Sequence, residues 1–497
     1  MNLATIIDAH PGDAVALISR GRNTTYGALR DQAAGYRGGL IDLGLVPGDR
    51  VGIACGNNWY FVASYLAVLG AGLVAVPLNP LAPAPELEQS LAAVGARALV
   101  VGPAARQAAA ELQRSHVPEL RHVIAARGVE LDGAVSLDDV LAAPPRPVVD
   151  RDPADVAALL FTSGTVGPPR AAMLTHGNLL ANLGQVQAHP RRKQLATDVS
   201  FAVLPFFHIF GLNVALGLTL YTGSRMLLVE RFDPMTAIES IAAHQVTVVG
   251  GAPPMWASWA ALPGTPEGAF SSVRLAVSGA AKLPVEVAET FEKRFGVRVT
   301  EGYGLTEAAP VVTAAAGDDQ PFGSIGTPLP GLELRLVDED GQDVLEGDAG
   351  EIWVRGPNVF AGYWEDPEAT AIALTPDGYL RTGDIAVVDD AGWVYLVDRI
   401  KDLIIVSGFN VFPAEVENVL RDHPAVKDVA VVGVPHPHQG EAVKAFVILE
   451  PGVAAEEDEI VAWCAERLAG YKCPSKILFV DELPRNPGGK LLRRALR

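Results

Sequence analysis

The chain contains little cysteine and is short of positive charge. Its 497 residues include only three cysteines, Cys55, Cys464 and Cys473, which lack metal-ligand spacing and cannot all pair within one chain. We therefore expect a reduced, cytoplasmic setting. Lys and Arg number 39 against 58 Asp and Glu, a formal net charge of −19. Because a nucleic-acid backbone is bound by clustered cations, this balance argues against a nucleic-acid partner, although local donors still allow a nucleotide to bind.

The sequence also lacks a signal peptide and an uninterrupted membrane span. The N-terminal MNLATIIDAH has neither a basic segment nor a long apolar one. Residues 59–78 carry no charge and have the length of a bilayer-spanning helix, but Gly70 and Gly72 interrupt them and the β-branched second half ends at Pro77. These features predict a buried helix at about 60–69 and a core strand at about 73–77. Peripheral membrane contact and the oligomeric state stay open.

What the chain does contain is a long alternation of strand-like and helix-like segments. Apolar runs at residues 50–56, 73–79, 96–102 and 246–253 alternate with segments of helical length that are rich in Ala, Leu and Glu. This pattern is typical of α/β proteins with largely parallel, buried sheets. From residue 323 to 397, short extended runs separated by the turn sequences DEDG, PDG and DDAG indicate a β-rich subdomain.

The predicted order of helices and strands changes again after residue 398. A helix following Pro413, two strands and a second helix indicate a small α+β domain. We thus predict an α/β fold with a large N-terminal domain, residues 1–397, that contains two α/β subdomains and the β-rich one. A small, mobile C-terminal domain would span residues 398–497.

A loop rich in glycine and hydroxyl residues follows the apolar strand VAALLF, and residues 160–170 read LFTSGTVGPPR. Small residues let the backbone approach phosphate oxygens, where amide and hydroxyl donors converge on negative charge. Arg170 adds a permanent cation. The glycine and lysine spacing of a Walker loop is absent, and the chain has no nucleophile elbow of the α/β-hydrolase type.

The longer run TSGTVGPPRAAMLTHGNL resembles the signature loop of the adenylate-forming superfamily, the AMP-binding enzymes that include acyl-CoA synthetases and fatty-acid–CoA ligases. Two positions depart from the usual pattern, because the family commonly has Thr at Val166 and Lys at Arg170. The first change removes a hydroxyl donor and the second alters the reach of the cation. The resemblance implies ATP-phosphate contacts from Thr162, Ser163, Gly164, Thr165, Gly167 and Arg170.

Two further segments resemble the nucleotide pocket of that superfamily. SGAA, residues 278–281, stands where the family lines its adenine and acyl pockets, which implies roles for Gly279, Ala280 and Ala281. EGYGLTE, residues 301–307, resembles the second core motif. It implies that Tyr303 stacks on adenine, that Thr306 donates to the α-phosphate and that Glu307, with Thr162, binds Mg²⁺. The motif's other nucleotide contacts would be Glu301, Gly302 and Gly304.

The remaining motifs follow in the order that the superfamily shows. YLRTGD (379–384) and DRIKD (398–402) resemble the ribose motifs, which implies contacts from Asp384, Arg399 and Lys401. SGFNV (407–411) resembles the loop that lines the pantetheine tunnel after the C-terminal domain rotates, with Ser407 and Gly408 beside the thiol. PRNPGGK (484–490) matches the catalytic-lysine motif, which assigns Lys490. His208, within LPFFHIFG, would gate the carboxylate pocket and is not expected to act as a base.

The resemblance implies an AMP-forming acid–thiol ligase with ATP, Mg²⁺ and coenzyme A as its cofactor and co-substrates. A carboxylate would attack the α-phosphate, and CoA would then take the acyl group. A carboxylate needs no deprotonation at neutral pH, so catalysis would come from positioning and charge neutralisation. The residues implied in catalysis are Lys490, Thr306, Glu307 and His208.

Several alternatives remain beside this reading. The acceptor could be a carrier protein instead of CoA, and a weakly catalytic binding or regulatory homologue is a second alternative, motivated by Val166 and Arg170. Apolar segments at residues 206–216, 250–256 and 308–312 predict a hydrophobic pocket for the carboxylic acid. It favours a medium- or long-chain fatty acid, with aryl or polyketide-like acids close behind.

Overall fold

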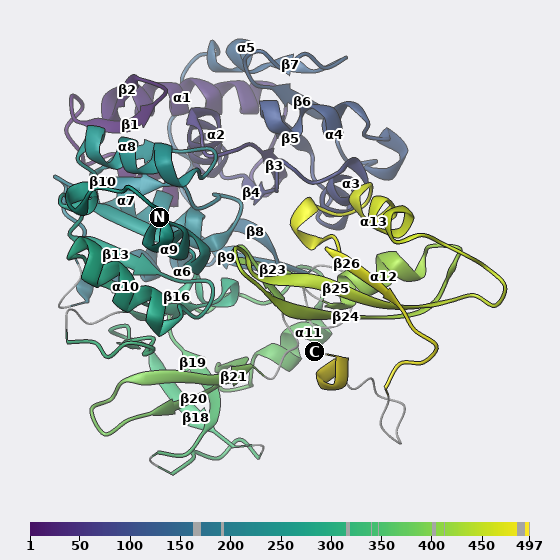
Figure 1. The fold of residues 1–497 in the computed structure, drawn as a ribbon. Helices are drawn as coiled ribbons and strands as arrows, with labels where there is room; N and C mark the ends of the chain where they lie inside the picture. Colours follow the sequence, from purple (N-terminus) through teal and green to yellow (C-terminus); the bar gives the residue numbers. More distant parts are fainter. Residues whose placement is uncertain are drawn as a thin grey trace.

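A computed structural model describes most of the chain. The described residues are 1–162, 170–189, 193–314, 319–338, 340–345, 347–399, 404–411, 413–484 and 493–496. They form a large N-terminal domain and a small C-terminal domain, and the C-terminal sheet lies to one side of the large domain (Figure 1). The α/β fold class with a large and a small domain is therefore confirmed, whereas the exact boundary at residue 398 stays a prediction.

Two seven-stranded sheets form the frame of the large domain. The first has the order β14-β13-β12-β10-β11-β1-β2, and only β2 pairs antiparallel. The second has the order β7-β6-β5-β3-β4-β8-β9, and only β9 pairs antiparallel. The predicted largely parallel sheets are thus confirmed, with an antiparallel strand at one edge of each.

Four of these strands, β3, β4, β5 and β12, lie within the apolar runs predicted at residues 50–56, 73–79, 96–102 and 246–253. The first sheet comprises β1 (Val15–Ser19), β2 (Arg22–Thr25), β10 (Val199–Ala202), β11 (Arg225–Leu228), β12 (Val248–Gly251), β13 (Leu275–Ser278) and β14 (Val299–Glu301). The second comprises β3 (Arg50–Ala54), β4 (Val74–Pro77), β5 (Ala98–Val101), β6 (His122–Ala125), β7 (Val135–Ser136), β8 (Val156–Thr162) and β9 (Arg170–Thr175).

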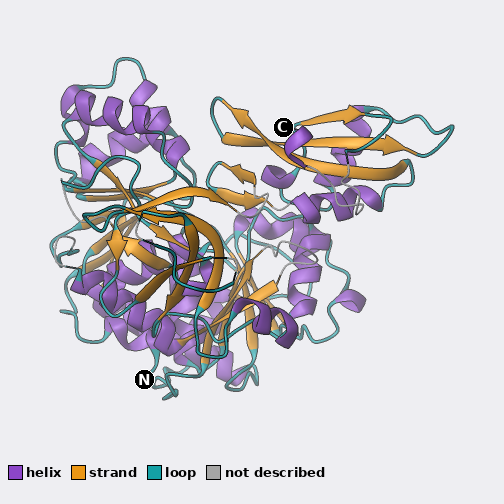
Figure 2. Ribbon diagram, turned by 90° about the horizontal axis from the view of Figure 1, so that it is seen from below, coloured by secondary structure: helices purple, strands orange, loops and turns teal. Residues whose placement is uncertain are grey.

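Helices pack around the sheets of the large domain (Figure 2). The helices of the large domain are α1 (Tyr26–Asp42), α2 (Trp59–Gly70), α3 (Ala84–Ala93), α4 (Arg106–Ala110), α5 (Leu137–Leu141), α6 (His176–Ala188), α7 (Leu218–Thr222), α8 (Pro234–His244), α9 (Pro253–Ala261), α10 (Val285–Phe295) and α11 (Pro367–Ala373). A π-helical segment, η4 (Phe210–Gly217), runs directly into α7. Such wide turns occur frequently at functional sites.

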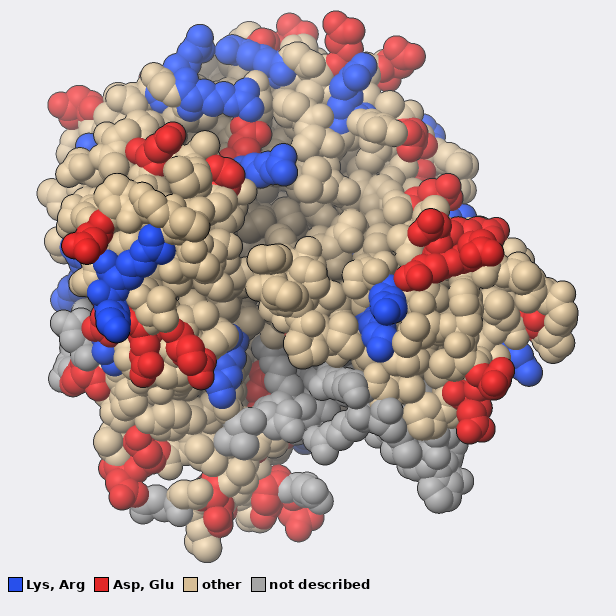
Figure 3. Space-filling model, in the orientation of Figure 1, with Lys and Arg blue, Asp and Glu red and all other residues tan. Residues whose placement is uncertain are grey.

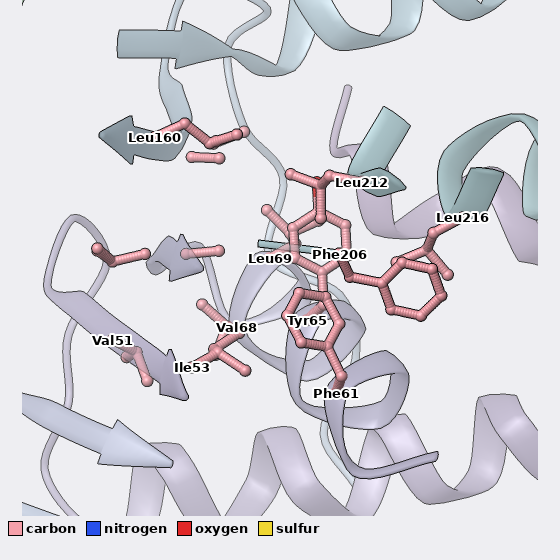
Figure 4. Packing of buried hydrophobic residues seen from close by; sticks show 14 of the residues in the cluster. Val51, Ile53, Phe61, Tyr65, Val68, Leu69, Leu160, Phe206, Leu212 and Leu216 are labelled. Atoms are coloured by element: carbon pink, nitrogen blue, oxygen red, sulfur yellow. The ribbon is translucent and has the colours of Figure 1, made fainter. Parts of the chain in front are cut away.

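The charge-free stretch of the sequence forms core structure, as predicted. Asn58 caps α2 by accepting a hydrogen bond from the backbone of Phe61, and β4 follows the helix. Phe61 and Tyr65 of α2 point toward Phe206 in a tightly packed cluster (Figure 4), with the rings of Phe61 and Phe206 5.3 Å apart. Burying each such side chain stabilises the fold by about 1.5–3 kcal/mol. No helix among the described residues is long and apolar enough to cross a membrane.

The two faces of the first sheet are treated differently. On one face Val249 and Ala276 pack against the tryptophans of α9, Trp256 and Trp259, in a closed core. On the other face the alternate strand residues line a cavity instead of being sealed by side chains. Because side chains in a strand point alternately to opposite faces, the same two strands, β12 and β13, build both a packed core and a pocket wall.

Three smaller sheets complete the described structure, and the first is the antiparallel sheet of β15 (Tyr303–Gly304), β16 (Val311–Ala314) and β17 (Thr327–Pro328). The predicted β-rich subdomain contains a four-stranded antiparallel sheet of β18 (Glu333–Val337), β19 (Gly350–Arg355), β20 (Leu380–Val388) and β21 (Val394–Arg399). The C-terminal sheet joins β22 (Ile404–Val406), β23 (Phe409–Val411), β24 (Val426–His436), β25 (Gly440–Leu449) and β26 (Lys476–Phe479). Helices α12 (Pro413–Arg421) and α13 (Glu457–Ala465) share a separate core with it, as expected for a small domain.

Candidate active site

A cavity of about 690 Å³ opens where the strands of the large domain end. Figure 3 shows a hollow near the middle of the molecule, with mostly uncharged residues in its wall and a few Lys, Arg and acidic side chains at its rim. Its wall is mainly formed by the large domain, and the small domain adds Phe409, Tyr471 and Lys472. Clefts at the carboxyl ends of parallel strands are the usual ligand sites of α/β folds.

The cavity brings together most of the predicted site residues that the structure describes. Four described ones, Ala281, Glu301, Ser407 and Gly408, do not line it. Ser163, Gly164, Thr165, Gly167, Lys401 and Lys490 lie outside the described residues, and only the backbone of Arg399 is described, paired with Asp384 across β20 and β21. The residues that do line it are Thr162, Arg170, His208, Gly279, Ala280, Gly302, Tyr303, Gly304, Thr306, Glu307 and Asp384.

Tyr303 and Asp384 form one polar corner of the cavity. The Tyr303 hydroxyl donates a hydrogen bond of 2.7 Å to Asp384 Oδ2, and Asp384 is only 7% exposed. The turn before it is held by Glu351, whose Oε1 accepts from the backbone of Gly383 at 2.8 Å. Glu351 also lines the cavity. Glu351 belongs to no recognised motif, which explains why it was not predicted from the sequence.

Glu307 occupies a second polar corner together with a residue that the sequence analysis missed. The Tyr363 hydroxyl donates to Glu307 Oε1 at 2.7 Å. Burial, reinforced by the nearby Glu307 charge, raises the pKa of Tyr363, so Tyr363 acts as a neutral donor. The hydrogen bond holds one carboxylate oxygen of Glu307, and the other oxygen could bind a cation. Thr162 lines the same cavity, and its hydroxyl donates to the backbone oxygen of Arg170 at 3.5 Å.

Arg170 has a carboxylate partner inside the protein. Its Nε donates to Asp366 Oδ2 at 2.8 Å, and its guanidinium lies 5.8 Å from the centre of the Tyr363 ring. Asp366 also caps α11 by accepting from the backbone of Ala369. That backbone bond, with the Arg170 ion pair, holds the pKa of the Asp366 carboxyl below its usual range. The contacts of Arg170 with Asp366 and Tyr363 hold the start of β9 against the segment that precedes α11.

The strand-to-helix turn at residues 278–281 is shaped by its neighbours. A side chain on Gly279 would place its Cβ 2.9 Å from the Phe210 ring, so a larger residue there would require the ring to shift. Ala280 has a φ of +69°, which is the conformation that favours glycine. Glu301, behind this turn, accepts from the backbone of Leu283 at 2.8 Å. Burial raises the pKa of Glu301 to about 7. Its hydrogen bond with the Leu283 backbone supports the turn from within the protein.

His208 sits on the cavity wall in its neutral form. Burial lowers the pKa of His208 to about 4. Its Nδ1 accepts a hydrogen bond from the backbone of Phe210 at 3.3 Å, so the proton of the neutral ring is on Nε2. The ring can therefore offer a single N–H donor to an oxygen in the cavity. The ring carries no charge at neutral pH and therefore does not form an ion pair with a carboxylate.

The loop of the small domain that carries Gly408 rests on the large domain. Gly408 has a φ of +84°, and a Cβ placed there would lie 2.7 Å from the Cβ of Ala252. The next residue, Phe409, stacks between two rings, with centroids 6.0 Å from Phe207 and 4.5 Å from Tyr471. This aromatic stack crosses from the large domain to the small one and borders the cavity.

A buried ion cluster also joins the two domains, and no motif pointed to it. Lys472 Nζ lies 2.8 Å from Glu86 Oε1 of α3 and 2.8 Å from Glu415 Oε1 of α12. Glu86 Oε2 additionally accepts from the backbone of Ala469 at 2.7 Å. Burial alone would lower the pKa of Lys472, but the two carboxylates raise it overall. The cation therefore stays charged and fastens the small domain to α3.

Searches for related proteins place the chain in a known family. The AMP-binding enzyme family matches residues 4–364, and the AMP-binding enzyme C-terminal domain matches residues 415–490. The chain belongs to this adenylate-forming family of acid–thiol ligases. The resemblance expected from the motifs is thereby confirmed.

Three curated relatives cover nearly the whole chain. The methyl-dioxo-octahydroindenyl propanoyl:CoA ligase of Mycobacterium tuberculosis is 38% identical, over 98% of this chain and 96% of the relative. The feruloyl-CoA synthase of an Amycolatopsis species is 39% identical, over 97% and 95%. The long-chain-fatty-acid–CoA ligase of Bacillus subtilis is 34% identical, over 97% and 91%. All three are CoA ligases, but the acids in their names differ.

Solved structures resemble the chain to different degrees. The amide bond synthetase McbA of Marinactinospora thermotolerans superposes with a TM-score of 0.89 at 31% identity, covering 100% of this chain and 99% of that one. The o-succinylbenzoate CoA synthetase of Bacillus subtilis, bound with its product analogue, gives 0.88 at 29% identity, over 100% and 98%. ATP-bound MatB of Rhodopseudomonas palustris gives 0.75 at 33% identity, over 100% and 98%.

Proposed function

We propose that the protein is an ATP-dependent acyl-CoA synthetase that activates an apolar carboxylic acid as acyl-AMP and transfers it to CoA. The observation that carries the proposal is that one cavity combines three parts. It has a nucleotide corner at Tyr303 and Asp384, a cation corner at Glu307, and a long apolar wall. The small domain closes over it through Phe409 and Lys472.

The first step joins the acid to the α-phosphate of MgATP. The carboxylate oxygen attacks phosphorus, and the bond to pyrophosphate breaks. No proton has to be removed, because the acid is already ionised at neutral pH. Glu307 and Thr162 would hold a Mg²⁺ ion, which would neutralise part of the developing charge, and the Thr306 hydroxyl, Lys490 and the phosphate loop would neutralise the rest. Glu307 suits this role because Tyr363 engages one of its oxygens and leaves the other available.

His208 supplies a neutral donor beside the reacting carboxylate. Its Nε2–H can hydrogen-bond to a carboxylate or acyl oxygen, which orients the acid without the strong pairing that a cation would give. Such orientation is the main lever left to the protein when the nucleophile needs no base. The ribose would bind at Asp384, with Arg399 and Lys401 beside it, and the adenine near Gly279, Ala280 and Tyr303.

The second step transfers the acyl group to the CoA thiol, and the orientation of the small domain supports it. The Gly408 loop lies against Ala252 and borders the cavity, where a thiol would have to arrive. The fold also superposes better on a CoA synthetase bound with a product analogue than on ATP-bound MatB, with TM-scores of 0.88 against 0.75. We infer that the orientation described here is the one used for thioester formation.

The acid is expected to be apolar over most of its length. Residues from all three apolar segments noted in the sequence line the cavity, among them Phe210, Val214, Gly250 and Val311. Medium- or long-chain fatty acids fit this wall, and so do aryl or polyketide-like acids. A carrier protein as acceptor remains the alternative to CoA.

The test is pyrophosphate release measured with a panel of carboxylic acids, followed by mass analysis of the product. The proposal predicts release that depends on an added acid and on Mg²⁺, and a product with the mass of acyl-CoA when CoA is present. A product formed only on a carrier protein would replace CoA with the alternative acceptor. Absence of acid-dependent release across the panel would contradict the assignment as an enzyme.

A further inference from the structure

The apolar arm of the cavity runs along the face of the first sheet from one edge to the other. At the catalytic edge it is lined by Gly279, and at the opposite edge by Ser200, Val248 and Leu275. These last three are aligned across neighbouring strands, because Ser200 pairs with Val248 and Val248 pairs with Leu275. From Leu275 to Gly279 is four residue steps, or about 13 Å at roughly 3.3 Å per residue.

The sides of this arm are apolar throughout. Val248, Gly250, Leu275 and Val277 form the sheet side. Opposite them lie residues of α6, η4 and α7: Val186, Val214, Ala215 and Leu218. None of the described residues that line this arm beyond the catalytic edge carries a charge. The arm is therefore suited to a carbon skeleton, and a second carboxylate or an ammonium group would be desolvated there without a partner.

The far end of the arm is polar. Gln194 and Ser200, which line the cavity there, are 5% and 4% exposed. The Gln194 amide nitrogen lies 2.7 Å from Ser200 Oγ, 3.2 Å from Thr219 Oγ1 and 2.7 Å from Ser224 Oγ. We call these four side chains, Gln194, Ser200, Thr219 and Ser224, the polar floor.

The polar floor has unused hydrogen-bonding capacity that faces the cavity. Thr219 donates its hydroxyl proton to the backbone of Ala215, and Ser224 has a backbone acceptor in Thr219. In the hydrogen bonds among described residues, by contrast, Gln194 Oε1 accepts none and Ser200 Oγ donates none. One acceptor and one donor are thus left at the end of an apolar tunnel, where an unmatched polar group is costly.

We propose that the polar floor selects acids whose carbon skeleton ends in a neutral oxygen function, a hydroxyl or a carbonyl, about 10 Å from the carboxylate, which is the ~13 Å length of the arm less one hydrogen bond of ~3 Å. The proposal rests on the acyl-CoA synthetase function and specifies its substrate class. A substrate hydroxyl donates to Gln194 Oε1, and a substrate carbonyl accepts from the Ser200 hydroxyl. A methyl-terminated chain of the same length leaves both groups unpaired.

The test compares matched pairs of acids over a series of chain lengths. Each pair consists of an ω-hydroxy or ω-oxo acid and the methyl-terminated acid with the same number of heavy atoms. For the wild-type enzyme we expect kcat/KM to favour the oxygenated acid by about 10-fold. The preference should peak at one length, because shorter chains do not reach the polar floor and longer ones collide with it.

Two variants and a control isolate the polar floor. Gln194→Met keeps the length of the side chain and should reduce the 10-fold ratio to about 1 for the ω-hydroxy acids, whereas Ser200→Ala removes only a hydroxyl and should do so for the ω-oxo acids, in both cases mainly through KM. Ser272→Ala is the control, because Ser272 bonds the backbone of Val246 and does not line the cavity. It should keep the wild-type ratio. Two variants are used so that a folding defect in Gln194→Met leaves Ser200→Ala to decide.

The outcomes separate this inference from the proposed function. Acyl-CoA formation without any preference at any length, or a preference that both variants retain, would overturn the polar floor and leave the ligase function intact. If no acid is converted, the ligase function fails. Calorimetric binding of the same acid pairs to the wild-type protein and to Ser200→Ala then decides the polar floor: loss of a preference in the variant supports it, and equal binding overturns it.

Discussion

The ion cluster between the domains gives a direct way to shift the balance between the two steps of the reaction. Glu86 of α3 bonds both Lys472 and the backbone of Ala469, and these contacts exist only while the small domain rests in its present orientation. The change Glu86→Gln removes the charge and keeps the shape. It should therefore weaken this orientation without disturbing the core of either domain.

The free-energy cost of Glu86→Gln depends on which hydrogen bonds and ion pairs Lys472 keeps. Losing charge-assisted hydrogen bonds costs about 1.5–3 kcal/mol, which is roughly a 10- to 100-fold change in the population of the orientation. Lys472 keeps Glu415 at 2.8 Å, so no buried charge is left without a partner. The loss should for that reason stay below the ~3–5 kcal/mol that follows when a buried ion is orphaned.

The assay separates the half-reactions. Exchange of pyrophosphate into ATP reports adenylation, and single-turnover transfer from supplied acyl-AMP to CoA reports thioester formation. Glu86→Gln should slow transfer by about 10-fold or more and leave exchange unchanged. Glu88→Gln is the matched control on the same helix, since Glu88 bonds Gln113 and His116 within the large domain.

Two results would refute this reasoning. Equal losses in exchange and transfer would mean that Glu86 acts on folding or on a step common to both. A loss in Glu88→Gln as large as that in Glu86→Gln would mean that α3, and not the contact between the domains, carries the effect. Thermal unfolding of Glu86→Gln is expected to match the wild type closely, because the buried cores lie within each domain.

Three further predictions follow. Lys490→Ala should abolish pyrophosphate exchange and spare transfer from supplied acyl-AMP; equal loss of both would contradict the family assignment of that lysine. Gly408→Ala should slow transfer by about 10-fold or more, because overpacking costs about 1–3 kcal/mol, whereas Gly452→Ala, also at positive φ but without a neighbour within 4 Å, should not. Burial, with the Arg151 charge, lowers the pKa of His176 to about 4. Between pH 6.5 and 4 the unfolded chain therefore binds more protons than the folded protein, and the protein loses stability as the pH decreases. From pH 7 to pH 5 the free energy of unfolding measured with urea should decrease by about 2 kcal/mol in the wild type, and His176→Asn should not show this decrease. Identical pH profiles for the two proteins would exclude the effect.

The sequence predicted the architecture well where local pattern decides it. The buried helix and strand expected at about 60–69 and 73–77 are α2 and β4, because an uncharged run broken by glycines can be buried only in such pieces. The β-rich subdomain was likewise visible in its turn residues. The antiparallel partners β2 and β9 were not, because pairing direction depends on where the chain returns and not on the composition of a strand.

The candidate site was predictable only where residues belong to one local segment. Asp384 and Tyr303 lie in separate motifs, and the sequence could not show that one bonds the other. Tyr363 and Glu351 belong to no motif, yet they hold Glu307 and the turn before Asp384. Gln194 is an ordinary loop residue in the sequence. Its proposed role comes only from the three hydroxyl side chains, Ser200, Thr219 and Ser224, that the fold places around its amide nitrogen.

The departure at Arg170 can now be understood in terms of its contacts. From the sequence, Arg170 was predicted to contact the ATP phosphates with a reach different from that of lysine. In the structure its Nε bonds Asp366 and its guanidinium lies over the Tyr363 ring. Tyr363 in turn donates to Glu307. A planar guanidinium can make an ion pair and a ring contact at once, whereas a lysine ammonium offers a single point of charge. Arginine at this position therefore ties the phosphate loop to the carboxylate that is expected to hold the cation, and its substitution should disturb Glu307 even where phosphate binding survives.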